Sequence, residues 1–288
     1  MNKYIAMRSD LRRKADLIIA CENSINKEYA DLDLTGVADP AQVIMDAIAE
    51  LDSQRESDDV AIVVEFMGGM ITLGSENESM GELNLSDYKN LHIHGNGVTI
   101  ESKGWDYVYA LKIQDCCLYD LNLICYHGMI GIQAVDNCTI TNCNVVMESL
   151  SEGFYVNKSI LTNCKATVKN WGEGIWAENS ILINCEAETG TIDYSLEGNS
   201  IYASKCTLLN CKGVMMGFDY GIYAEDSTIT NCFGSSSSYG IYAEGSIVTG
   251  GCNGGNGGLL IDGSSYPQDL SIAQNLNFGY IIIQGVND

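Results

Sequence analysis

Aromatic and acidic side chains recur at fixed positions in this chain, in a pattern that suits sugar binding. Six similar tetrads place a polar or aromatic residue between two apolar ones, namely Gln133, Tyr155, Trp176, Tyr202, Tyr223 and Tyr242. Two residues after five of these come Asn157, Glu178, Ser204, Glu225 and Glu244. Flat ring faces beside carboxylate and amide oxygens match the C–H faces and hydroxyls of a glycan. The first set is therefore the candidate ligand-binding site.

Two other interpretations of the aromatic residues stay open. Tyr and Trp fit pleated strands well without any ligand, and an exposed aromatic stripe is also typical of a contact between subunits. A second stripe competes for the same role, because apolar residues recur among threonines where a cover is needed. Its members are Ile160, Ile181, Ile183, Leu209 and Ile247.

Glu178, Glu225 and Glu244 are the best candidates for acid or base chemistry. A retaining glycosidase needs two carboxylates about 5 to 5.5 Å apart, and Glu225 and Glu244, one repeat apart, could meet that spacing. Two exposed carboxylates at about 5 Å repel by only about 0.8 kcal/mol in water. A fold can therefore carry such a pair without using it, and no catalytic residue is assigned.

A repeat of about 21 residues must position these side chains. Each copy ends in Asn-Cys, with the asparagine at Asn142, Asn163, Asn184, Asn210 and Asn231. Helical repeats need about 33 to 47 residues, whereas three short strands fit this length, with rungs about 4.8 Å apart. We expect an all-β solenoid, a right-handed single-stranded parallel β-helix of about 8 to 10 rungs, whose stacked asparagines bond from rung to rung.

Three domains are expected along the chain. Residues 1–32 are predicted to form a helical arm, because six of the fifteen Lys and Arg residues lie in the first 27 positions and apolar residues recur there near heptad spacing. These apolar positions are Tyr4, Met7, Leu11, Ile18, Cys21 and Ile25. Residues 33–58 hold a capping helix, with Asp39 as N-cap and Pro40 at the first helical position. Residues 59–288 form the β-helix, in which a strand at Tyr280–Ile283 and the segment 270–286 close the far end.

Composition excludes several classes of function. A net charge of −23 disfavours nucleic acid as a partner. Five of the twelve cysteines recur at one inward position, where free thiols act as small hydrophobes, namely Cys143, Cys164, Cys185, Cys211 and Cys232. The chain has no Cys-x-x-Cys pair for a metal. No cofactor and no metal are expected. The sequence also lacks a signal peptide and a long apolar run, so we expect no membrane insertion.

Residues 33 to 262 resemble the pectate-lyase-like right-handed β-helix superfamily, and most closely its bacteriophage tail-spike and tail-fibre members. The resemblance lies in the capping helix, a Gly68–Leu73 hairpin, Leu91–Gly97 and the Asn-Cys rungs. Its enzymes are not matched in their catalytic residues. The Asn-Thr-Asp and Gly-His-Gly motifs of polygalacturonase-like members are absent, the Asp-Asp motif is missing from the repeats, and no arginine follows Arg55 to act as the base of a pectate lyase.

The resemblance implies a virion structural protein, a phage tail-spike, tail fibre or other surface appendage. We expect a homotrimer, made in the host cytoplasm, whose basic N-terminal segment docks on a virion neighbour and whose β-helix presents a face to a host glycan or another partner. The first alternative is a polysaccharide depolymerase, a glycoside hydrolase or lyase on the same fold. The second is a cytoplasmic scaffold with no ligand.

Overall fold

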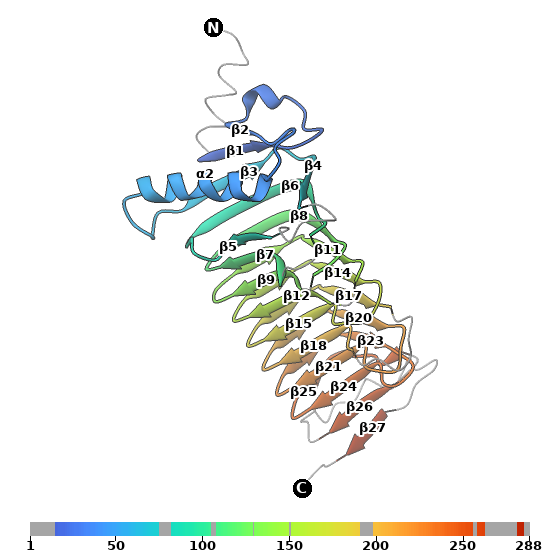
Figure 1. Cartoon of the computed structure of the whole chain (residues 1–288). Helices are drawn as coiled ribbons and strands as arrows, with labels where there is room; N and C mark the ends of the chain where they lie inside the picture. Colours follow the sequence, from blue (N-terminus) through green and yellow to red (C-terminus); the bar gives the residue numbers. More distant parts are fainter. Residues whose placement is uncertain are drawn as a thin grey trace.

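The chain winds into a rod of stacked parallel strands (Figure 1). The computed structural model describes residues 15–74, 82–104, 108–128, 130–149, 151–190, 198–255 and 258–262, and the strand 281–284. Its strands form one sheet of seventeen strands, sheet A, and one of ten, sheet B, and every pairing between named strands is parallel. The predicted right-handed parallel β-helix is confirmed.

Each full rung contributes one strand to sheet B and two to sheet A. The strands of sheet B are β5 (Leu83–Leu85), β7 (Tyr109–Gln114), β9 (Ile130–Val135), β12 (Glu152–Asn157), β15 (Ile175–Glu178), β18 (Ile201–Ser204), β21 (Ile222–Glu225), β24 (Ile241–Glu244), β26 (Leu259–Asp262) and β27 (Ile281–Gln284). The second strands of the rungs are β10 (Thr139–Thr141), β13 (Ile160–Thr162), β16 (Ile181–Ile183), β19 (Thr207–Leu209), β22 (Thr228–Thr230) and β25 (Ile247–Thr249). The third strands are β11 (Asn144–Met147), β14 (Lys165–Val168), β17 (Glu186–Thr189), β20 (Lys212–Met215) and β23 (Phe233–Ser235). Towards the N-terminus, sheet A continues with β1 (Leu17–Ala20), β2 (Leu32–Asp33), β3 (Ile62–Phe66), β4 (Met70–Leu73), β6 (Leu91–Ser102) and β8 (Cys117–Cys125).

Alternating burial explains why these segments are strands. In β21, Ile222 and Ala224 are fully buried while Tyr223 is partly exposed, which is the two-residue period of a strand with one face in the core. The cysteines beside the corner asparagines point inward, and all twelve cysteines are free, with eleven of them buried. Burial raises the pKa of Cys138 and Cys206 to about 11, so these thiols pack as small apolar groups.

The asparagine corner bends the chain between the second and third strands. All five asparagines have φ between 52° and 55°, a left-handed conformation that Asn tolerates better than most residues. The Asn163 side chain donates to Asn142 Oδ1 at 3.2 Å, Asn184 donates to Asn163 Oδ1 at 3.1 Å, and Asn210 donates to Asn184 Oδ1 at 3.1 Å. Asn231 Oδ1 instead accepts from the Gly251 amide at 2.8 Å. The corner side chains therefore tie successive rungs together.

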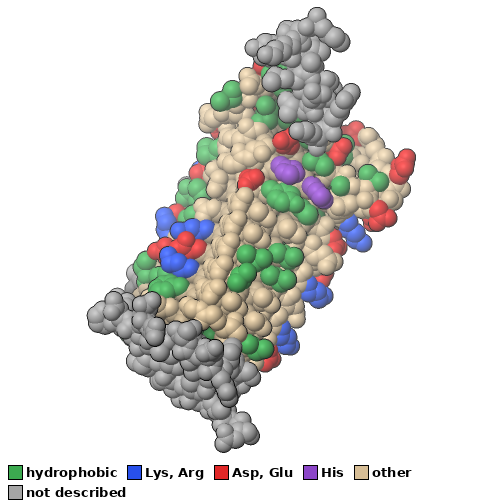
Figure 2. Space-filling view, turned by 180° about the vertical axis from the view of Figure 1, so that it is seen from behind, with side chains coloured by type: hydrophobic (Ala, Val, Ile, Leu, Met, Phe, Trp, Pro, Cys, Tyr) green, Lys and Arg blue, Asp and Glu red, His purple; other side chains and the backbone are tan. Residues whose placement is uncertain are grey.

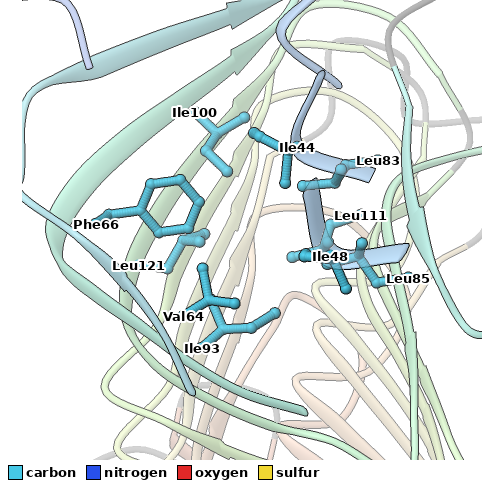
Figure 3. A pocket seen from close by; sticks show the side chains of 10 residues that line it. All are labelled: Ile44, Ile48, Val64, Phe66, Leu83, Leu85, Ile93, Ile100, Leu111 and Leu121. Carbon is cyan, nitrogen blue, oxygen red and sulfur yellow. The ribbon is translucent and has the colours of Figure 1, made fainter. Parts of the chain in front are cut away.

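Helix α2 (Pro40–Gln54) lies across the N-terminal end of the coil (Figure 1). The Asp39 side chain accepts from the Gln42 amide at 3.1 Å, which caps the helix as the sequence indicates. Ile44 and Ile48 are buried and face the first rungs across a small apolar cavity (Figure 3). Its other lining residues are Val64, Phe66, Leu83, Leu85, Ile93, Ile100, Leu111 and Leu121. The helix covers an end of the core that would otherwise face water.

The helix expected within residues 1–32 is wrong for the part that the structure describes. Residues 17–20 form β1, which pairs with β3 and β2 and is buried along its whole length. Ile25, expected on an apolar helix face, is 78% exposed. Four consecutive buried apolar residues suit a strand covered on both faces better than an amphipathic helix with one apolar stripe. The other heptad positions, Tyr4, Met7 and Leu11, lie outside the described residues.

The Gly68–Leu73 segment is a corner of the coil and not a hairpin. β3 and β4 pair in parallel with successive halves of β6, and they do not pair with each other. Gly68 and Gly69 have φ of 76° and 101°, so the turn between the strands requires glycine. At the other end of the rod, the expected strand at Tyr280–Ile283 is present as β27, one residue later. The rest of the 270–286 cap lies outside the described residues.

Candidate functional site

The predicted aromatic residues form one continuous column on the outer face of sheet B. Strand register places them opposite one another from Gln133 to Tyr242. Neighbouring ring centroids lie 4.9 to 6.2 Å apart, with the closest pair at Trp176 and Tyr202. The Tyr202 and Tyr223 rings stack almost in parallel, at an interplanar angle of 6°. All five rings are partly exposed, so the column is a ridge of aromatic surface.

Two tyrosines that the sequence analysis missed widen this column. The Tyr220 ring lies 5.5 Å from Tyr223 and 5.0 Å from Tyr242, and Tyr239 lies 6.2 Å from Tyr220. Each precedes a glycine, Gly221 or Gly240, which is buried together with the next residue. Two consecutive buried residues shift the strand alternation by one, so these tyrosines face outward where a strict period of two predicts inward. The sequence signal for this shift is the glycine that lies two residues before Tyr223 and Tyr242.

The predicted polar column runs beside the rings, and three of its side chains accept hydrogen bonds from them. Asn157, Glu178, Ser204, Glu225 and Glu244 are opposite one another in register. Trp176 Nε1 donates to Glu178 Oε1 at 3.2 Å, the Tyr202 hydroxyl donates to Glu225 Oε2 at 3.4 Å, and the Tyr223 hydroxyl donates to Glu244 Oε2 at 2.9 Å. The aromatic residues therefore orient the carboxylates while leaving other oxygen lone pairs open to a ligand.

Glu152 and Glu173 make a third column on the other side of the rings. The Gly153 amide donates to the Glu173 carbonyl, and this places the two acids on adjacent rungs. Burial and the nearby charge of Glu173 raise the pKa of Glu152 to about 7, and burial also raises the pKa of Glu173. The buried Oε2 atom of Glu152 has no hydrogen-bond partner among the described residues. Neither acid is indicated by the period of two, although each directly precedes a glycine of the repeat.

The three candidate catalytic acids occupy less distinctive surroundings. Glu225 and Glu244 are opposite each other on β21 and β24, as expected, but Ser204 separates Glu178 from them. All three accept hydrogen bonds from aromatic side chains. Glu152 combines burial, a raised pKa and an unsatisfied oxygen, the usual features of a general acid. Glu152 is therefore a better acid candidate than the residues selected from the sequence.

The competing apolar stripe lies on the second strands, in sheet A. Ile160, Ile181 and Ile247 are 38%, 40% and 47% exposed, and Thr207 and Thr228 separate the last two. Towards the N-terminus the same sheet carries a stack of the His94 and Tyr119 rings, 4.9 Å apart. Figure 2 shows hydrophobic patches, histidines and a mixed cluster of basic and acidic side chains on the side of the rod opposite the view of Figure 1. The isoleucines are thus interrupted by threonines, unlike the aromatic column.

Neither a metal-binding cluster nor a membrane-spanning helix is found in the described part of the chain. Within the described ranges, no three His, Cys, Asp or Glu side chains gather as they would around a metal ion. His92 instead contacts the Asn90 side chain at 3.2 Å. Among the same residues no helix is long and apolar enough to span a bilayer.

Solved structures share this fold at low sequence identity. The ORF18 protein of Geobacillus virus E2 aligns over 86% of this chain with 14% identity and a TM-score of 0.55, and this chain spans 57% of its length. The A-module of the Azotobacter vinelandii mannuronan C-5 epimerase AlgE4 aligns over 87% of this chain and 93% of its own, with 14% identity and a TM-score of 0.50. No family model and no curated protein matches the chain. The chain has the right-handed parallel β-helix fold of the pectate-lyase-like proteins.

Proposed function

We propose that this protein is a virion surface appendage whose sheet B face binds a host glycan. One observation carries the proposal, the unbroken column of five rings from Tyr155 to Tyr242 with carboxylates on both sides. The rings offer apolar platforms to the C–H faces of sugars, and the carboxylates accept hydrogen bonds from hydroxyls. A repeated surface of this kind suits a repeated ligand such as a polysaccharide.

Features of the whole chain support the virion role. A virus protein is among the solved structures that share the fold. Lys3, Arg8, Arg12, Arg13 and Lys14 give the first fourteen residues five of the fifteen basic residues in a chain of net charge −23. A basic segment on an acidic rod favours docking to an acidic neighbour. We place the protein in the virion, as a homotrimer held through this segment.

Glu152 favours a second candidate function, a polysaccharide depolymerase that uses the same face. A carboxyl group with a pKa near 7 is protonated in part at neutral pH, as a general acid requires. It lies on the rung of Tyr155, whose own pKa is raised mainly by burial and to a smaller extent by the charges of Glu178 and Glu152. If the protein cleaves a glycan, Glu152→Gln should abolish formation of the cleavage products while leaving glycan binding intact.

A panel of immobilised host-surface polysaccharides tests the proposed function. The full chain should adhere to at least one polysaccharide, and Trp176→Ala should weaken that adhesion. Tyr126→Ala is the matched control, because Tyr126 is a 37% exposed aromatic residue outside the column. Equal loss in both variants, or no adhesion to any polysaccharide, would contradict the proposal. Conversion of an oligomer to monomers by Trp176→Ala would identify the column as a subunit interface.

A further inference from the structure

The two long faces of the rod differ in how their acidic side chains are paired. On the third strands of sheet A, Glu186 lies between two lysines, with Lys212 Nζ at 2.6 Å and Lys165 Nζ at 3.7 Å. Glu148 pairs with Lys169 at 2.6 Å. These pairs stabilise the ionised form of the acids, and the hydrogen bond from Lys212 accordingly lowers the pKa of Glu186. Sheet A therefore neutralises Glu186 and Glu148, although Glu188 on β17 has no ion pair among the described residues.

The sheet B face carries five carboxylates without such partners. They are Glu152, Glu173, Glu178, Glu225 and Glu244, and in the described part of the chain no Lys, Arg or His nitrogen lies within 4.0 Å of any of them. Lys158, at the corner after the sheet, is paired with Asp136 at 3.0 Å. Lys112 continues the central column two rungs before Tyr155, and its Nζ lies over the Tyr109 ring. The aromatic column is thus bordered by negative charge along the side of Glu178, Glu225 and Glu244, while burial raises the pKa of Glu152 and Glu173 on the other side.

This arrangement limits which glycans can bind. Ionised carboxylates only accept hydrogen bonds, so the ligand must supply the donors. A uronic or sulfated sugar would bring further acceptors and a like charge, which disfavours it. A protonated amine brings up to three donors and an opposite charge. It also interacts favourably with the faces of Tyr and Trp rings.

We propose that the sheet B face selects glycans that carry free amino groups, such as partly deacetylated N-acetylglucosamine polymers. The inference rests on the proposed glycan-binding function and specifies its ligand class. Rings at intervals of 4.9 to 6.2 Å along the column contact the sugar faces, while the carboxylates of Glu178, Glu225 and Glu244 accept from the ammonium groups. The Oε2 atom of Glu178 already accepts from an amide donor, Asn157 Nδ2, at 3.1 Å.

Three hexasaccharides separate the charge of the ligand from its length. They are N-acetylated chitohexaose, its fully deacetylated form and hexagalacturonate, each titrated into the full chain at about pH 6, where ordinary glutamates are ionised. We expect the deacetylated hexamer to bind about tenfold more tightly than the acetylated one at low salt. The difference should shrink at about 0.5 M NaCl, because salt screens exposed charges. Hexagalacturonate should bind least.

Substitutions on the two faces supply matched controls. Glu178→Gln and Glu225→Gln should each weaken binding of the deacetylated hexamer by about 1.5- to fivefold, whereas Glu186→Gln on sheet A should not. Equal binding of both chitohexaose forms, with Trp176→Ala weakening both, would overturn the amino-sugar inference and leave glycan binding in place. Tighter binding of hexagalacturonate, or no binding of any hexamer, would also overturn it. The proposed function itself would be contradicted by failure across the whole polysaccharide panel, or by equal loss of adhesion in Trp176→Ala and Tyr126→Ala.

Discussion

At the scale of single residues, neighbouring groups determine what each acid on sheet B can do. Glu178, Glu225 and Glu244 are oriented by aromatic donors. Glu152 lies deeper, beside Glu173, and its Oε2 atom has no partner in the described structure. The sequence predicted the first group from a period of two. It could not place the second, because a strict period of two points Glu152 inward, whereas the two consecutive buried residues Gly153 and Phe154 turn it to the outer face.

Glu152 should make the stability of the fold depend on pH. Its pKa is raised from 4.5 to about 7 in the folded chain, so the folded state binds more protons than the unfolded state between these values. The free energy of unfolding should therefore fall as pH rises from about 4.5 to about 7. Glu152→Gln should remove this part of the slope and stabilise the fold above pH 7 by about 1 to 2 kcal/mol, after allowance for solvent screening.

Thermal unfolding between about pH 4 and pH 8 measures this effect. Glu186→Gln is the control of opposite sign, because the lysines beside Glu186 lower its pKa. The stabilisation that Glu186 contributes is present above its unfolded pKa and is lost as pH falls through the folded one. A Glu152→Gln variant with the same pH dependence as the unsubstituted chain would show that Glu152 is ionised normally in solution.

At the scale of elements, local signals predicted most of the fold. The N-cap at Asp39, the asparagine corners and the alternating strands each depend on nearby residues, and all appear in the structure. Local signals did not predict the structure of residues 17–20, because β1 is a strand only through its pairing with β3 and β2. Tyr220 and Tyr239 joined the aromatic column for a similar reason, as their direction depends on the buried glycine that follows each.

The asparagine corner should respond to substitution in an unusual order. Asn184 has φ of 52° and bonds to asparagines on both adjacent rungs. Asn184→Ala loses both hydrogen bonds and keeps a Cβ in a left-handed conformation, at a cost of about 1 to 2 kcal/mol, without the short polar side chain that lets Asn tolerate it. Asn184→Gly loses the same bonds without that strain. Alanine should therefore destabilise the fold by about 1 kcal/mol more than glycine.

Urea unfolding followed by circular dichroism compares the two variants. The same pair of substitutions at Thr167, an outward position on β14 with no left-handed backbone, is the control. There glycine should be the more destabilising residue, as it is in ordinary strands. If Asn184→Gly were less stable than Asn184→Ala, the corner would not be under the backbone constraint inferred here.

At the scale of the whole molecule, the N-terminal end of the core is covered by residues that belong to the rod itself. β1 and α2 close that end of the core, so residues 17–54 belong to the β-helix and not to a separate arm. The predicted boundary at residue 32 therefore falls within the fold. The basic residues before position 15 are left as the segment proposed to anchor the protein.

Removal of residues 1–14 should separate assembly from folding. If the basic segment holds the proposed homotrimer together, light scattering should give a trimer for the full chain and a monomer for the shortened one. The β-sheet signal in circular dichroism and the unfolding temperature should be kept, because β1 is retained. Removal of residues 1–30 is the comparison, since it deletes β1 and exposes the edge of β3, and it should reduce stability. The same mass for the full chain and the chain lacking 1–14 would contradict the anchoring role.

The central claim is that the aromatic column on sheet B binds a glycan, and calorimetric titration of Trp176→Ala tests it most directly. The ligand is an oligosaccharide of the polysaccharide that binds most strongly in the panel. It is titrated into the unsubstituted chain, Trp176→Ala and Tyr126→Ala. We predict that Trp176→Ala loses about 1 to 3 kcal/mol of binding free energy, by analogy with other aromatic stacking sites. Tyr126→Ala should keep full affinity. Unchanged affinity in Trp176→Ala would contradict the account, because Trp176 contacts rings on both adjacent rungs of the column.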